Sequence, residues 1–156
     1  MLLVGSLQPL TLDVPRINRR FEQPEVAAAL REVGVASPQA LLATWVTDRD
    51  GLLNYAGNAE PVTDDQPRIE YAPWVRPREI ARVLPTLLAL RREPPLENAE
   101  PAFRAAVDDE WTRLHSFYSV ILHAYSGDRD EWARQARQVM REDGGNPYYR
   151  WFFGSQ

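Results

Sequence analysis

The chain has 156 residues, of which 44% are hydrophobic and 26% are charged, a composition that indicates a folded globular protein and excludes a disordered one. Its net charge of −4 argues against nucleic-acid binding through bulk charge, and the lack of cysteine excludes disulfides and thiolate metal sites. All 18 basic residues are arginine, which excludes lysine Schiff-base chemistry, and no apolar run reaches the ~18 residues of a membrane span.

Two short segments near the start of the chain have the pattern of β-strands. Residues 2–5 form an apolar run, and residues 10–13 alternate apolar and polar side chains. Two isolated strands bury little surface and leave their edges unpaired. We therefore expect this β element to pair with a second copy of the chain or with a brief strand at residues 68–71.

Residues 24–58 carry the signals of three short helices. Pro24 suits a first helical position, and Gly34 suits the end of the same helix. Ser37 is the expected N-cap of the second helix, and Asp48 or Asp50 is the expected N-cap of the third.

Residues 59–77 have no periodicity and hold the best candidate site of the first half. Asp64 and Asp65 are adjacent in an aperiodic loop, and Glu70 follows closely. Carboxylates that converge in a loop can bind a metal cation or an amine. In the alternative interpretation, Asp64 caps a turn and Asp65 pairs with an arginine, without a catalytic role.

The second half has helical periodicity. A stripe at residues 80–88 predicts an amphipathic helix that Pro85 kinks or splits. A longer helix follows, then a tight turn at 126–128, a second helix through residues 132–140, and a stop at 144–147. The longer helix carries a heptad-like seam formed by Val107, Trp111, Leu114, Tyr118, Ile121 and Tyr125.

The last segment, residues 148–153, contains five aromatic side chains in six residues. It either presents a binding platform or folds back into a groove between helices, and we favour the folded-back arrangement. The residues that we expect to form an interaction surface, from the seam and from this segment, are Trp111, Tyr118, Tyr125 and Trp151.

The two histidines, His115 and His123, lie eight residues apart on the longer predicted helix. This separation corresponds to ~12 Å along the axis, so the pair alone cannot hold one metal ion. We expect no metal site, and we expect His115 to be packed and hydrogen-bonded.

The first half resembles the end of spermidine synthase-like proteins. The resemblance rests on the ordered pieces LLVGS, PLTLD, PEVAAALREVGVASPQALL and TDDQPRIEY, and it covers residues 1–73. It implies a Rossmann-like aminopropyltransferase fold, with decarboxylated S-adenosylmethionine as donor and a diamine as acceptor. The glycine-rich cofactor loop and the acidic gate loop of that family have no counterpart here. We therefore expect no cofactor in this chain and no transferase activity from it alone.

The resemblance places Asp64, Asp65 and Glu70 in an acidic, polyamine-attracting mouth of an intact protein. The expected partners are a polyamine, the rest of the parent protein, or a second copy of this chain, without nucleic acid or membrane insertion. We expect a cytoplasmic location, although the parent protein has a possible membrane anchor.

Residues 121–153 resemble one degenerate tetratricopeptide-type helical hairpin. The sequence thus predicts a mainly α chain with a small β element at its start, divided into residues 1–73 and a helical extension at 74–156. The alternative fold class is α+β, with the end of a Rossmann-like sheet followed by helices. For function, the prediction is a fragment of a polyamine synthase-like protein, and the alternative is a helical interaction or oligomerisation module.

Overall fold

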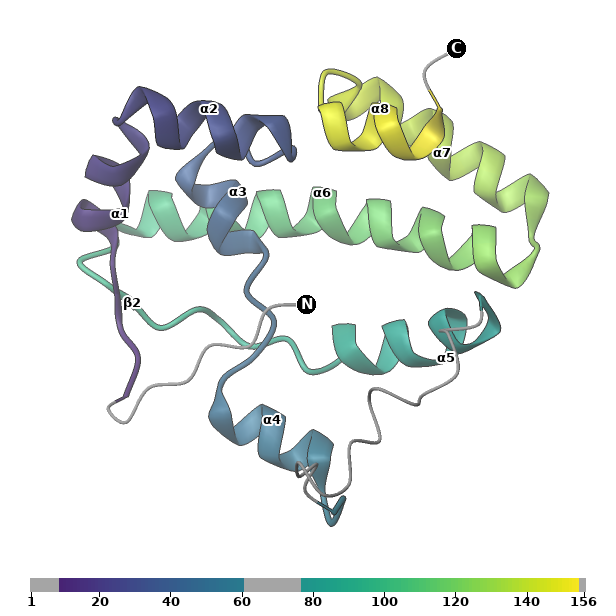
Figure 1. Ribbon diagram of the computed structural model, residues 1–156, viewed down its shortest axis with the longest axis horizontal. Helices are drawn as coiled ribbons and strands as arrows, with labels where there is room; N and C mark the ends of the chain where they lie inside the picture. Colours follow the sequence, from purple (N-terminus) through teal and green to yellow (C-terminus); the bar gives the residue numbers. More distant parts are fainter. Residues whose placement is uncertain (1–8, 61–76, 155–156) are drawn as a thin grey trace.

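The computed structural model describes residues 9–60 and 77–154 (Figure 1). The elements of these two ranges are, in chain order, β1 (Leu12–Asp13), α1 (Val14–Phe21), α2 (Pro24–Glu32), α3 (Pro38–Ala43), α4 (Arg49–Ala56), α5 (Pro77–Leu88), β2 (Leu96–Glu97), α6 (Pro101–Ser126), α7 (Arg129–Asp143) and α8 (Pro147–Phe153). The prediction of a mainly helical chain with a small β element and helical hairpins is confirmed.

Helix α6 is the axis of the fold. It has 26 residues and runs across the whole molecule, with α1–α3 beside one half and α7 and α8 beside the other (Figure 1). Helix α7 returns along α6, while α3 and α5 pack on it from different sides. Residues from the first and second halves of the chain therefore share contacts, and the division at residue 73 stays a prediction.

The small sheet joins two distant parts of the chain. Leu12 pairs with Leu96 and Asp13 pairs with Glu97 in parallel orientation. The carboxylate of Asp13 then caps α1 by accepting from the backbone N–H of Arg16 at 3.1 Å, and it also accepts from Asn98 at 2.7 Å. The predicted partners of this strand were a second copy or residues 68–71. The latter lie outside the described residues, and the sequence indicated no strand at Leu96–Glu97.

The termini of the short helices follow the local signals in the sequence. Ser37 caps α3 by accepting from the backbone of Ala40 at 3.0 Å, and Asp48 caps α4 by accepting from Gly51 at 2.9 Å. Asp48, and not Asp50, is therefore the N-cap of α4. Helix α1 was not predicted, although Asp13 followed by a proline two residues later is a helix-start signal.

Helix α5 contains Pro85 without being divided by it. The helix continues to Leu88, three residues beyond the proline, and the backbone N–H of Ala89 still donates to the carbonyl of Pro85 at 3.0 Å. A proline this close to the helix end removes one hydrogen bond of the last turn, which the helix tolerates. Of the two effects expected of Pro85, a kink or a split, the split is therefore wrong, and the kink stays a prediction.

The main core lies where α6, α7 and α8 meet. Its buried members are Phe117, Val120, Ala136, Val139 and Tyr149. Of the predicted seam only Val107 is fully buried, while Phe117 and Val120 are more buried than the five other seam residues. The seam prediction is confirmed only in part: the five other seam residues are half-buried, and Tyr118 and Ile121 pack against the main core. Because helices cover α6 from several directions, no single stripe defines its buried side.

Helix α8 is the folded-back aromatic segment. The ring of Phe117 stacks on Tyr149 with centroids 4.3 Å apart, and it meets Phe152 and Phe153 edge to face at 5.2 and 5.9 Å. Such ring pairs contribute ~0.5–1.5 kcal/mol each beyond the burial of their area. The expectation that this segment packs back onto the helices is confirmed.

Candidate functional site

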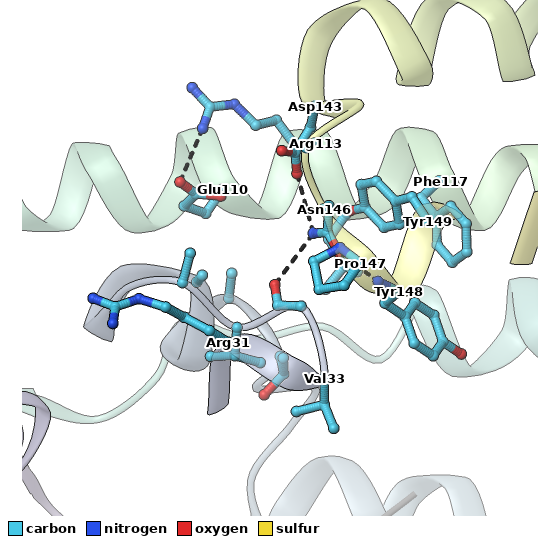
Figure 2. Close-up of a pocket in the computed structure, with 18 of the residues that line it drawn as sticks. Arg31, Val33, Glu110, Arg113, Phe117, Asp143, Asn146, Pro147, Tyr148 and Tyr149 are labelled. Atoms are coloured by element: carbon cyan, nitrogen blue, oxygen red, sulfur yellow. Dashed lines mark hydrogen bonds and ion pairs between the residues drawn. The ribbon is translucent and has the colours of Figure 1, made fainter. Parts of the chain in front are cut away.

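A cavity of about 660 Å³ opens between α2, the middle of α6 and the start of α8. Its wall on the α2 side is the connection from Arg31 to Ala36, and its opposite wall is the connection from Asp143 to Tyr149 (Figure 2). The size falls within the ~300–1,000 Å³ of small-molecule sites, and the lining combines aromatic side chains with a few polar groups, as such sites do. This cavity is the candidate site.

The first wall is set by the turn at Gly34. Gly34 has φ +83°, and the backbone N–H of Val35 donates to the carbonyl of Leu30 at 2.9 Å, which closes the end of α2. A side chain at this position would be strained, and its Cβ would lie 2.4 Å from Oδ1 of Asn146. A glycine is thus needed both for the turn and for the close approach of the opposite wall.

Asn146 holds the two walls together. Its Nδ2 donates to the carbonyl of Gly34 at 3.2 Å and to Oδ2 of Asp143 at 3.1 Å. Its Oδ1 accepts from the backbone N–H of Tyr148 at 3.0 Å and so caps α8. One side chain therefore begins the aromatic helix and fixes it to a turn 112 residues earlier in the chain. Figure 2 shows these contacts between the two walls.

The aromatic part of the lining consists of Phe117, Tyr118, Tyr148 and Tyr149. Burial raises the pKa of Tyr149 to about 12, assisted by the carboxylate of Asp143, and burial also raises the pKa of Tyr118. Both phenols are therefore neutral O–H groups at neutral pH. Neither hydroxyl forms a hydrogen bond with another residue of ranges 9–60 and 77–154.

The charged part of the lining contains one ion pair and two further charges. Arg113 donates to Glu110 at 2.9 Å, and this pair is partly exposed. Asp143 accepts from the neutral amide of Asn146, while the guanidinium of Arg31 has no ion pair or hydrogen bond with the described residues; the backbone carbonyl of Arg31 accepts from Gly34 at 3.0 Å.

The residues predicted to form an acidic site, Asp64, Asp65 and Glu70, lie outside the described residues. None of the described ranges contains a cluster of three or more histidine, aspartate or glutamate side chains that could hold a metal ion. Among the described helices none is both long enough and apolar enough to cross a membrane.

The four residues predicted to form an interaction surface are placed differently from one another. The guanidinium carbon of Arg91 lies over the Trp111 ring, 4.4 Å from the ring centroid. Tyr118 packs against the main core and lines the cavity. Tyr125 is half-buried near the end of α6. Trp151 is 74% exposed, and its ring lies 5.9 Å from that of Tyr148.

The expectation for His115 is wrong. This side chain is exposed, and its ring lies 5.9 Å from the ring of Trp111 without a hydrogen bond to any described residue. The side of α6 that carries Phe117 faces the core, so His115 lies on the side that faces solvent.

The cavity was not predicted from the sequence. The sequence predicts a helix stop at 144–147, but the hydrogen bond from Asn146 to Gly34 joins residues 112 positions apart, and no local pattern indicates it. The exposed Trp151 was among the predicted surface residues.

Comparison with known proteins adds no relative. No protein-family model matches the sequence, and neither the curated proteins nor the solved structures that were compared give a significant match. The resemblance of residues 1–73 to spermidine synthase-like proteins and the tetratricopeptide-like interpretation of residues 121–153 therefore stay predictions.

Proposed function

We propose that this chain is a helical interaction module that associates with a second copy through an apolar patch at the mouth of the cavity. The patch, hereafter the mouth patch, consists of Val33, Tyr148 and Trp151. The observation that carries the proposal is the exposure of Trp151, which is 74% exposed next to Tyr148, a lining residue of the cavity. Val33 lines the same cavity and is 60% exposed.

The chemistry of the mouth patch favours a copy of itself as partner. A two-fold symmetric dimer places the same surface on both sides of the interface, so the surface must be compatible with itself. An uncharged patch with an aromatic centre meets this condition, because apolar side chains gain from contact with their own kind. Trp and Tyr are also the residue types that dominate the binding energy of protein interfaces.

The mouth patch is the centre of the proposed interface and not its full extent. Stable interfaces bury ~800 Å² on each partner, whereas a buried aromatic side chain accounts for ~150–250 Å². The remaining area would come from the surrounding residues of α2 and α8, which lie side by side.

Sedimentation velocity over a range of protein concentrations tests this proposal. We expect the unaltered chain to dimerise, and we expect Trp151→Ser and Val33→Ser to shift it toward the monomer. The matched controls are Leu53→Ser and Tyr55→Ser, which remove exposed apolar side chains of α4, far from the cavity in sequence. A chain that stays monomeric at high micromolar concentration, or controls that dissociate the dimer equally, would overturn the proposal.

A second proposal follows from the resemblance of residues 1–73. We propose that the chain is a cytoplasmic C-terminal fragment or remnant of a spermidine synthase-like protein, without transferase activity by itself. The order of its pieces from LLVGS to TDDQPRIEY supports this, as do three short helices, α2–α4, between them. Calorimetry at low salt provides the test. Spermidine and putrescine should bind more tightly than sodium ions, and Asp64→Ala with Asp65→Ala should abolish the difference; equal heats for amines and NaCl would contradict it.

A further inference from the structure

Tyr149 is a buried residue whose hydroxyl group has no hydrogen-bond partner within ranges 9–60 and 77–154. The residue is 6% exposed. In the same ranges, the side-chain polar atoms that are both fully shielded and unpartnered are Nε1 of Trp45 and Oγ1 of Thr47. The Tyr149 hydroxyl is therefore not sealed in the core, and because Tyr149 lines the cavity, the hydroxyl opens into that space. Buried polar groups normally have a partner, so this hydroxyl indicates where a bound molecule can supply one.

Two carboxylates and a second phenol lie close to this hydroxyl. Burial is the main cause of the raised pKa of Tyr149, and the next causes are Asp143, Tyr118 and Glu110. A neighbouring group acts on a pKa in this way only over several ångströms. All three neighbours also line the cavity. These four residues together form one end of the cavity, hereafter the polar end.

The carboxylate of Asp143 is held in place by Asn146. Its Oδ2 accepts from Nδ2 of Asn146 at 3.1 Å, and Oδ1 of the same amide accepts from the backbone N–H of Tyr148 at 3.0 Å. The carboxylate therefore lies one amide group away from the first turn of α8, which carries Tyr149. The other carboxylate oxygen, Oδ1 of Asp143, has no hydrogen-bond partner among the described residues. It can accept from a bound molecule.

The charges of the polar end favour a cation over an anion. Glu110 is neutralised by Arg113 at 2.9 Å, whereas Asp143 has no ion pair with a described residue. The guanidinium of Arg31 does not change this balance, because it is exposed and Figure 2 draws it pointing away from Asp143. Phenol hydroxyls can donate to an anion or accept from a cation. The unpaired carboxylate decides between the two, because it attracts a cation and repels an anion.

We propose that the polar end of the cavity binds the primary ammonium group of a small cation with an apolar body. An ammonium group has three N–H donors, which match Oδ1 of Asp143 and the hydroxyl oxygens of Tyr149 and Tyr118. The apolar body lies on Leu114, a lining residue four positions from both Glu110 and Tyr118 and therefore on the same face of α6. This inference goes beyond both proposed functions and rests on neither, since it uses no residue of the mouth patch and none of residues 64–70.

Four probes with the same hexyl chain test the chemistry of the head group on the unaltered chain. Hexylammonium carries the charge and the N–H donors, hexyltrimethylammonium carries the charge alone, 1-hexanol is uncharged, and hexanoate is negative. In NMR titrations we expect hexylammonium to bind at least about tenfold more tightly than each of the others. The inference is overturned if hexylammonium does not bind, if the trimethylated or uncharged probe binds equally well, or if hexanoate binds more tightly.

Two conservative variants assign the contacts. Asp143→Asn and Tyr149→Phe should each weaken hexylammonium binding about tenfold. Asp143→Asn keeps an oxygen that can accept from Asn146, and Tyr149→Phe keeps the ring that stacks on Phe117. The matched controls are Asp109→Asn and Tyr55→Phe, which alter exposed residues that do not line the cavity. Undiminished binding by the cavity variants, or an equal loss in the controls, would overturn the inference.

Two further titrations keep this test apart from the proposed functions. The double variant Asp64→Ala with Asp65→Ala should bind hexylammonium as tightly as the unaltered chain does. Loss of binding in that variant would place the amine at residues 64–65 and would overturn the inference. Trp151→Ser should also retain binding whether or not the unaltered chain dimerises, and a loss there would contradict a site built within one chain.

Discussion

Replacement of Phe117 is expected to detach α8 from the rest of the molecule. The Phe117 side chain is 1% exposed and contacts four rings of α8, those of Tyr148, Tyr149, Phe152 and Phe153. Truncation of a buried phenylalanine to alanine costs ~3–5 kcal/mol. We expect Phe117→Ala to lower the free energy of unfolding by about 4 kcal/mol, because the loss of the ring pairs adds to the loss of buried area.

Phe117→Ala should increase local opening of α8 in addition to lowering the stability of the whole fold. Urea denaturation gives the change in the free energy of unfolding, and amide hydrogen exchange gives the protection of residues 149–153 in α8. Phe117→Ala should reduce that protection far more than Val107→Ala, which removes a buried side chain at the other end of α6. Phe117→Leu should cost less than Phe117→Ala, since it retains much of the apolar volume, but it also loses the four ring contacts. A loss below ~1.5 kcal/mol for Phe117→Ala, or unchanged exchange in α8, would refute this account of how α8 is held.

Three further predictions concern the walls of the cavity. Asn146→Ala should lower the free energy of unfolding by about 2 kcal/mol, because it removes both a helix cap and the hydrogen bond to Gly34; a denaturation midpoint equal to that of the unaltered chain would contradict this. Gly34→Ala should destabilise by at least ~1 kcal/mol, since φ is +83° and the new Cβ would meet Asn146; thermal unfolding measures it, and a stabilised protein would show the turn to be described wrongly. The raised pKa of Tyr149, about 12 in the folded chain, contributes to the free energy of unfolding; this contribution should be complete below pH 10 and should be lost between pH 10 and 12. Its size is about 1–2 kcal/mol after allowance for solvent in the cavity. Denaturation curves of Tyr149→Phe should lack this part of the alkaline dependence.

The parts of the fold that could be predicted are those encoded in a few consecutive residues. Ser37, Asp48 and Asn146 each stand directly before a helix, and a short polar side chain there satisfies the free N–H groups of the first turn. Gly127 ends α6 with φ +81°, a conformation that glycine adopts without strain. Such signals need no knowledge of distant contacts, so the sequence alone locates most helix ends.

The rest depends on which surfaces meet. The apolar residues of α6 occupy more than one face, so their spacing alone does not show that Phe117 and not Trp111 becomes the centre of the core. The pairing of Leu12 with Leu96 and the tie between Asn146 and Gly34 connect distant positions of the chain. The second of these contacts joins two walls of the cavity, and a lining assembled from such distant segments could not be deduced from local patterns.

In the proposed function, the mouth patch joins two copies of the chain. Isotope-filtered NMR on a mixture of labelled and unlabelled chains tests it most directly, because it detects only contacts between different molecules. We predict intermolecular contacts from the Trp151 indole and the Val33 methyl groups. Intermolecular contacts at Leu53 and Tyr55 instead, or none at concentrations where the unaltered chain should be dimeric, would contradict it.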